Sequence, residues 1–354
     1  MTFSRRQLWL LALGILLGVM ASLALLIGWI SWSERNPEQE RDLRILVQDR
    51  LHEWFPEQMS LPEDVFGFHP ANQAGKNAPP AVILLHGLDE PGGIWDSLAD
   101  ALDQAEIAAW SFRYPNDQAI DQSADLLADA WPELDSKPAV TLIGHSMGGL
   151  VIRDFVTRHL AELLDREDDL SDAVSSVVMV GTPNQGSDWS RLRAWLEVRE
   201  TFADLQQGRF SLFASLRDGT GAAKIDLRPD SAFLQGLNQR EWPNQIPLKL
   251  IGGRLMEPGE TIRQSVEMLA EELGDPSLRQ DILEWWATAS QQVGDGVVPV
   301  ESLQIPGQAE PLLLEASHRG LLVRSPDQHS LPPAIPPILE WLGVEPETVP
   351  ASVP

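Results

Sequence analysis

Residues 141–155, TLIGHSMGGLVIRDF, place Ser146 between two glycines, directly after an apolar run and directly before a helix-like pattern. Gly144 to Gly148 match the motif G-x-S-x-G, in which a strained turn from a strand into a helix holds the serine at an exposed apex. Side chains at the two glycine positions would collide in so tight a turn. Because the short motif also arises by chance, its context carries the assignment: a strand before and a helix after predict a nucleophile rather than a helix-capping serine.

Short apolar runs alternate with helical patterns on both sides of this stretch. The strand-like runs are residues 81–87, 107–115, 139–146, 175–183, 246–254 and 310–318, and the helical patterns are residues 96–105, 122–134 and 147–164. This alternation predicts an α/β fold with a mostly parallel central sheet and helices on both faces. A loop is expected over residues 72–80, NQAGKNAPP, just before the first strand.

A serine hydroxyl needs a general base, and the base needs a carboxylate to fix its tautomer. Functional groups of an open parallel sheet collect at the carboxyl ends of its strands. His318 follows the last apolar run and is the expected base, with His329 as the reserve candidate. His86 and His145 adjoin other motifs, and we expect them to shape loops.

Asp295 is the expected acid. It lies between two glycines in GDGVVPVES, and it precedes the strand of His318, which gives the chain order Ser, Asp, His. The alternative is an ordinary turn aspartate, since Asp-Gly is a common turn dipeptide. Glu301, or an acid within residues 255–292, is the fallback.

Acyl transfer also develops an oxyanion, which backbone N–H donors must stabilise. One donor is expected to be the N–H of Met147, at the start of the helix after the nucleophile. The other is expected to be the N–H of Leu88, which follows His86-Gly87 in the loop after the first strand. A plain strand-ending turn is the alternative for this loop.

Five motifs in order, HGL, GHSMGG, GTPNQGS, GDGVVPVES and SHRG, resemble the lipase branch of the α/β-hydrolase superfamily over about residues 80–345. That branch includes triacylglycerol lipases and glycosylphosphatidylinositol-inositol deacylase-like proteins. The resemblance implies the α/β-hydrolase fold, a triad of Ser146, Asp295 and His318, and Leu88 and Met147 as oxyanion donors. It implies a place near the pocket for GTPNQGS, to which we assign no chemical role.

Two insertions depart from the compact pattern. Residues 187–245 are rich in aromatic residues without a clear strand, and residues 255–292 contain Trp285 and Trp286. We expect both to be helical cap insertions whose aromatic side chains line an acyl pocket, touch a bilayer or pack the cap itself.

The N-terminus predicts a membrane anchor. Residues 8–30 carry no charge and would extend about 34 Å as a helix, enough to cross a bilayer core. Arg5 and Arg6 precede this segment and acidic residues follow it, so the positive-inside rule predicts an extracytoplasmic body. A cleaved signal peptide is less expected because no small-residue cleavage site follows Ile30, and SRRQLW also resembles a twin-arginine signal.

The segment after the anchor has apolar residues at helical spacing, and we expect an amphipathic helix that packs on the body or spaces it from the membrane. The expected domains are therefore an anchor over 1–32, this helix and a linker over 33–78, a catalytic domain over 79–345 and a tail over 346–354.

Composition excludes several functions. The formal net charge is −26, which argues against nucleic-acid binding. Cysteine is absent, so disulfides, thiolate metal sites and a cysteine nucleophile are impossible. We find no phosphate loop, dinucleotide fingerprint or histidine pair at ligand spacing, and expect neither cofactor nor metal.

The residues together predict a membrane-anchored serine hydrolase that cleaves carboxylic esters, with lipid esters favoured by the anchor. The alternatives are an acyltransferase with the same triad, or a catalytically silent protein of this fold that binds a partner. Oligomeric state, acyl length and head group do not follow from the sequence.

Overall fold

The structure is a computed structural model. It describes residues 5–62, 64–88, 93–134, 139–160, 170–188, 217, 219–254, 266–267, 279–280, 283–284, 292–324 and 330–344. Several sequence-based expectations lie outside these residues: most of the 255–292 insertion including Trp285 and Trp286, residues 189–216 of the first insertion, His329, and the tail over 346–354.

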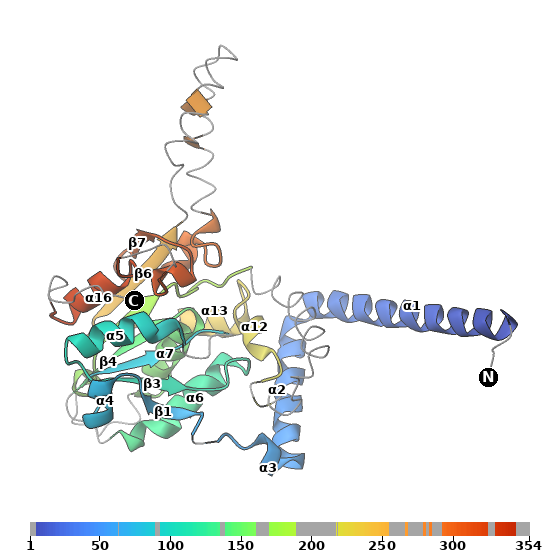
Figure 1. The fold of residues 1–354 in the computed structure, drawn as a ribbon, viewed down its shortest axis with the longest axis horizontal. Helices are drawn as coiled ribbons and strands as arrows, with labels where there is room; N and C mark the ends of the chain where they lie inside the picture. The colour runs from blue at the N-terminus through green and yellow to red at the C-terminus, as the bar shows by residue number, and fades with distance from the viewer. Residues whose placement is uncertain are drawn as a thin grey trace.

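A seven-stranded sheet in the order β1-β3-β2-β4-β5-β6-β7 forms the centre of the molecule (Figure 1). Its strands are β1 (Gly67–Pro70), β2 (Val82–Leu85), β3 (Ala109–Arg113), β4 (Val140–His145), β5 (Val174–Val180), β6 (Leu248–Arg254) and β7 (Leu312–Glu315). Every neighbouring pair is parallel except β1 with β3. The predicted mostly parallel sheet is confirmed, and β1 is an addition that its sequence, GFHP, does not signal.

Helices cover both faces of the sheet, as predicted. The larger ones are α5 (Asp96–Gln104), α6 (Ile120–Ala130), α7 (Met147–Arg158), α13 (Ala232–Asn238) and α16 (Ile335–Trp341). Shorter ones are α4 (Gln73–Asn77), α9 (Leu170–Ala173), α12 (Ala222–Asp226) and the 3-10 turns η1 (Gly93–Trp95), η2 (Trp131–Glu133), η3 (Val300–Leu303) and η4 (Arg319–Leu321).

Alternate side chains of one strand enter two separate cores. In β2, Ile83 and Leu85 belong to the cluster built with α6 and α7, whereas Val82 and Leu84 belong to the cluster built with α5 and α16. All four are fully buried. A strand covered on both faces reads as a continuous apolar run, which explains why the sequence reveals these strands so clearly.

The N-terminal residues form two long helices, α1 (Arg5–Arg35) and α2 (Pro37–Trp54), followed by the short α3 (Pro56–Met59). Helix α1 covers the segment expected to anchor the chain, and Figure 1 shows it extending away from the body. Among the described residues, no helix is both long enough and apolar enough to span a bilayer. The anchor therefore stays a prediction.

The expected amphipathic helix is present as α2, but it meets the body through its polar face. Its buried residues are Glu40 and Gln48, and it packs against α12. The apolar positions Leu43, Leu46 and Val47 are exposed. Of the two expectations for this segment, packing on the body is found, and the packing face is the charged one.

The loop expected over residues 72–80 is wrong in part, because α4 lies within it. The Asn72 side chain accepts a hydrogen bond from the Gly75 N–H at 2.8 Å, which caps the helix start. In the first insertion, the described part of residues 187–245 contains α12 and α13 and no strand. Phe233 of α13 is buried in the larger core cluster, so its ring packs this part of the insertion against the body.

Candidate active site

Ser146 occupies a strained turn between β4 and α7. Its backbone angles are φ 53° and ψ −125°, a left-handed region that costs a non-glycine residue free energy and is typical of functional positions. The Ser146 N–H donates to the Val180 carbonyl at 2.9 Å, which fixes the turn to the end of β5. A Cβ on Gly144 would lie 2.5 Å from the Gly149 nitrogen, so the turn requires glycine there.

The start of α7 lies directly against the exit of β2. A Cβ on Gly148 would come within 2.2 Å of the Leu85 carbonyl oxygen and 2.6 Å of that of His86. This contact brings the first N–H groups of α7, which have no intrahelical acceptor, beside the loop that carries Leu88. Met147 and Leu88, the two residues expected to donate to an oxyanion, thus belong to adjoining segments, and both side chains are buried.

Asp295 and His318 form a hydrogen-bonded pair. His318 Nδ1 lies 2.7 Å from Asp295 Oδ2, and the His318 N–H donates to the Asp295 carbonyl at 2.9 Å. The other carboxylate oxygen, Oδ1, accepts from the N–H groups of Val297 and Val298 at 2.9 and 2.8 Å. The Asp295 side chain is fully buried and that of His318 is 11% exposed, so the carboxylate is held away from solvent.

Two neighbours of Ser146 connect it to this pair. The ring of His145, the preceding residue, lies 4.6 Å from the ring of His318, centroid to centroid. Gly181, which follows the acceptor Val180, has φ +60°, and a Cβ there would lie 3.1 Å from His318 Nδ1 and 3.3 Å from Asp295 Oδ2. The turn of Ser146 and the Asp295–His318 pair are therefore built around the same two residues.

His145 has the loop-shaping place expected of it. It is fully buried, its Nε2 lies 3.3 Å from the His318 carbonyl, and its ring also meets Trp95 edge-on at 6.4 Å. These contacts wedge the imidazole between η1 and the segment that carries His318.

The motif GTPNQGS, to which we assign no chemical role from the sequence, holds the segment that carries Asp295 in place. Ser187 Oγ donates to the Val297 carbonyl, and Asn184 Nδ2 donates to the Leu303 carbonyl at 2.9 Å. Ser302 Oγ donates to the Gly186 carbonyl at 2.6 Å. This set of contacts holds residues 295–303 against the end of β5, where the serine turn is also fixed.

Tyr114 supports the β2 exit loop, and sequence reasoning missed it. Its hydroxyl donates to the His86 carbonyl, and its ring stacks on the His86 ring at 4.5 Å. The residue directly follows β3, so its place at the carboxyl end of a strand is the signal that could have found it. His86 is therefore a loop-shaping residue, as expected.

Glu301, the fallback acid, is exposed in η3. The other described histidines, His52, His69 and His159, bond to Gln48, Phe66 and Asp125 away from the serine turn. In the described part of the chain, no group of three His, Asp or Glu side chains could hold a metal ion.

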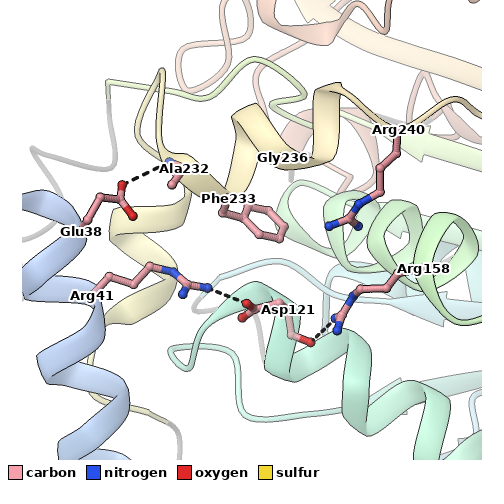
Figure 2. Close-up of a pocket in the computed structure, with 8 residues that line it drawn as sticks. All are labelled: Glu38, Arg41, Asp121, Arg158, Ala232, Phe233, Gly236 and Arg240. Atoms are coloured by element: carbon pink, nitrogen blue, oxygen red, sulfur yellow. Dashed lines mark hydrogen bonds and ion pairs between the residues drawn. The ribbon is translucent and has the colours of Figure 1, made fainter.

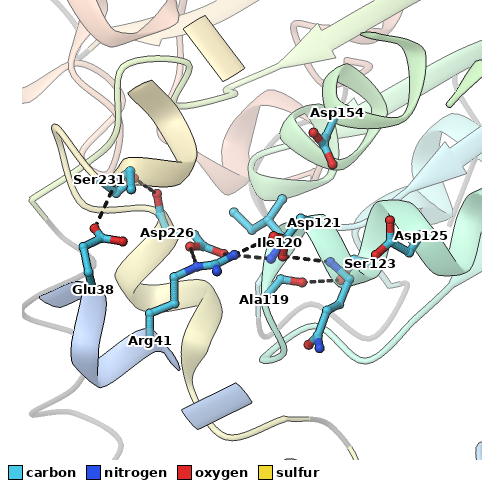
Figure 3. Close-up of polar contacts among 12 residues, drawn as sticks. Glu38, Arg41, Ala119, Ile120, Asp121, Ser123, Asp125, Asp154, Asp226 and Ser231 are labelled. Atoms are coloured by element: carbon cyan, nitrogen blue, oxygen red, sulfur yellow. Dashed lines mark hydrogen bonds and ion pairs between the residues drawn. The ribbon is translucent and has the colours of Figure 1, made fainter. Parts of the chain in front are cut away.

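A cavity of about 280 Å³ lies between α2, α6, α7 and α13 and contains none of the predicted site residues (Figure 2). Its arginines are paired: Arg41 with Asp121 at 2.8 Å, and Arg158 and Arg240 with Asp154. Arg41 also lies 2.5 Å from Asp226, which accepts from the Ile120 N–H at 2.9 Å (Figure 3). The contacts of Arg41 form a polar joint between α2, α6 and α12 rather than a continuation of the serine site.

Burial raises the pKa of the Asp226 carboxyl to about 7, although Arg41 and the Ile120 N–H act in the opposite direction. The desolvation of a fully buried carboxylate is the larger effect here.

Comparison with known proteins gives one family and a set of similar folds. A protein-family model described as "Alpha/beta hydrolase family" matches residues 82–329. A comparison with curated proteins gives no match. Among solved structures, the lipase BlEst2 of Bacillus licheniformis in mature form is 13% identical, with 78% of this chain and 97% of that chain covered and a TM-score of 0.46.

Two other similar structures have comparable values. The lipase of Staphylococcus hyicus is 14% identical, with 77% and 96% covered and a TM-score of 0.47. YbtT, a type II thioesterase from the yersiniabactin NRPS/PKS biosynthetic pathway, is 16% identical, with 80% and 99% covered and a TM-score of 0.46. At such identities these likenesses carry no information about the substrate.

Proposed function

The chain belongs to the alpha/beta hydrolase family, and from this premise we propose that it is a serine hydrolase that cleaves carboxylic esters. The observation that carries the proposal is the buried Asp295–His318 pair beside a serine in a strained turn. A catalytically silent protein has no need to keep a serine at φ 53° or to bury a carboxylate against an imidazole.

The proposed mechanism follows from the tautomer of His318. Because Nδ1 faces Asp295 Oδ2 at 2.7 Å, Nδ1 carries the proton and Nε2 is left as the base. Nε2 removes the proton of Ser146 as Oγ attacks the ester carbonyl, and then gives it to the leaving alcohol. Water, activated by the same nitrogen, releases the acid from the acyl-enzyme and restores the serine.

The N–H groups of Met147 and Leu88 stabilise the oxyanion of each tetrahedral intermediate. The close approach of Gly148 to the Leu85 and His86 carbonyls supports this role, since it fixes the two donor segments relative to one another. Donors fixed before the reaction begins are the main source of such stabilisation, and the loss of one costs about 10²- to 10³-fold in kcat.

The test is turnover of p-nitrophenyl esters of increasing acyl length by the full-length protein in nonionic detergent. Ser146→Ala and Asp295→Asn are each expected to lower kcat by about 10⁴-fold or more. Ser175→Ala, at the opposite end of the sheet, is the matched control and keeps full turnover. If the wild-type protein neither cleaves any ester nor reacts with a fluorophosphonate, the proposal fails and the silent binding protein replaces it.

The proposal also includes a lipid ester as substrate and a membrane location, with the catalytic region of residues 79–345 on the extracytoplasmic side. An uncharged segment over residues 8–30, preceded by Arg5 and Arg6, supports this location. Retention of the protein in the membrane pellet after extraction at alkaline pH tests it. Release into the supernatant would refute the anchor and leave the esterase activity unaffected.

A further inference from the structure

The exposed face of α2 carries an apolar stripe. Leu43, Leu46, Val47 and Trp54 are 39%, 51%, 42% and 66% exposed, and their spacing places them on one side of the helix. A soluble protein normally turns such a stripe towards its core. In this chain the contacts of α2 with the body come from an adjoining face of the helix, which carries the buried Glu40 and Gln48.

The polar side of α2 is fixed to the body by specific contacts, so the helix cannot roll to bury the stripe. Arg41 bridges to Asp226 of α12 at 2.5 Å and to Asp121 of α6 at 2.8 Å (Figure 3). One turn later, the Thr220 hydroxyl donates to the Arg44 carbonyl at 2.8 Å. The stripe therefore faces outward by construction.

Helix α1, which precedes α2 in the chain, also carries exposed apolar side chains. These include Trp9, Leu13, Leu17, Met20, Leu25, Ile27 and Trp29. Trp29 and Trp32 pack together at 5.2 Å close to the junction with α2, and indoles favour the boundary between water and lipid. Figure 1 shows α1 leaving the end of α2 next to α12, roughly across the direction of α2 and away from the body.

We propose that α2 lies flat in the interface of a bilayer, with the stripe of Leu43, Leu46, Val47 and Trp54 against lipid and the catalytic body on the water side. The proposal rests on the anchoring part of the proposed function, because a chain whose α1 enters the bilayer brings this face of α2 to its surface. An interfacial helix of this kind buries its apolar face at the boundary of headgroups and acyl chains.

Charge selects the type of lipid. Asp42, Asp49 and Glu53 flank the stripe, and Arg50 within it is paired with Glu53 at 2.5 Å. The whole chain has a formal net charge of −26. Anionic headgroups would repel this surface, so the bilayer that fits is zwitterionic or neutral. With α2 in the interface, the enzyme has a fixed height and orientation above a neutral lipid surface. A flexible linker would not provide either.

The absence of cysteine makes a direct test possible, since an introduced cysteine is the sole thiol of the chain. Leu46→Cys and Val47→Cys probe the stripe, Asp49→Cys is the control on the flank of the same helix, and Gln104→Cys is an exposed control on the body. Each full-length variant is labelled with an environment-sensitive nitrobenzoxadiazole dye and reconstituted into phosphatidylcholine vesicles. Vesicle flotation measures anchoring in the same samples.

The expected result is a blue-shifted emission at 46 and 47, with quenching by acyl-chain-brominated lipid at least twofold stronger than at 49 or 104. Variants that float with the vesicles while the dyes at 46 and 47 remain quenched only by aqueous iodide would overturn the inference and leave the anchor intact. Variants that do not float would refute the anchor itself, and with it the inference. Dyes at 46 and 47 that neither bromolipid nor iodide quenches would also overturn it, because the stripe would then be covered by a second copy of the chain.

Discussion

Gly181 brings the end of β5 close to both members of the Asp295–His318 pair. A methyl group at this position would sit 3.1 Å from the His318 ring at a backbone φ of +60°, so the ring and the carboxylate must move to make room. Gly181→Ala is expected to lower kcat at least about tenfold, since a misplacement of 1 Å costs a well-positioned catalytic group on the order of 10²-fold. Ester turnover measures the change.

Gly307→Ala is the matched control. Gly307 has a similar φ of +79°, but nothing lies within 4 Å of its added Cβ. Both substitutions impose the same backbone strain, of about 1 kcal/mol, and Gly307→Ala should change stability alone. An equal loss of turnover in the two variants would mean that backbone strain, and not contact with His318, causes the loss in Gly181→Ala.

The sequence identifies the site residues whose type and position both indicate catalysis. It does not identify the residues that support the site by close packing. Ser146, Asp295 and His318 could be selected because each follows or precedes an apolar run, and the structure brings Asp295 and His318 into contact. Gly181 and Tyr114 also directly follow strands, but glycine and tyrosine are not residue types that mark a general base, acid or nucleophile. Their importance depends on a close approach between strands that are distant in the chain.

At the scale of elements, the joint between α2, α6 and α12 makes stability depend on pH. The Asp226 carboxyl has a pKa near 7 in the folded protein and an ordinary value of 3.8. A raised pKa means that the folded state binds the proton more tightly, so this contribution to stability is complete below about pH 4 and is lost as the pH rises through 7. The free energy of unfolding therefore falls over this range on account of Asp226, by at most about 1.4 kcal/mol per pH unit.

Asp226→Asn is expected to remove this slope. Urea-induced unfolding of the full-length protein in nonionic detergent, at several values between pH 4 and pH 7.5, measures it in the wild type and the variant. Asp129→Asn removes one negative charge from an exposed site on the neighbouring α6 and controls for net charge. Parallel curves for the wild type and Asp226→Asn would show that Asp226 has no part in the pH dependence.

Prediction of elements succeeds where a strand is a continuous apolar run and fails where local signals are weak. Strands β2 to β7 can be recognised in the sequence as apolar runs. In contrast, β1 contains glycine and proline, and α4 contains glycine and asparagine. The face of α2 could not be predicted, because the sequence shows that the helix is amphipathic but not that its polar side meets the acids of α6 and α12. Tertiary ion pairs decide that orientation.

For the whole molecule, 52 acidic against 26 basic side chains imply strong self-repulsion in the folded state. Salt screens this repulsion, with a Debye length that falls from about 30 Å at 0.01 M to about 3 Å at 1 M. The midpoint of thermal unfolding in nonionic detergent is expected to rise by a few degrees, roughly 2–6 °C, as NaCl increases from about 0.02 to 0.5 M. Far-UV circular dichroism follows the transition.

Choline chloride at the same ionic strengths separates screening from sodium binding, since both salts should act equally if charge repulsion is the cause. A midpoint that falls with salt would mean that the ion pairs of the protein outweigh its net charge.

The two outer strands of the sheet, β1 and β7, have only four residues each, and β1 ends in Pro70. A strand so short offers few unpaired N–H and C=O groups to another chain, and proline offers no N–H at all. The molecule therefore limits its capacity to template amyloid-like stacking. This property would be useful on the membrane surface proposed above, where neighbouring copies meet far more often than in solution.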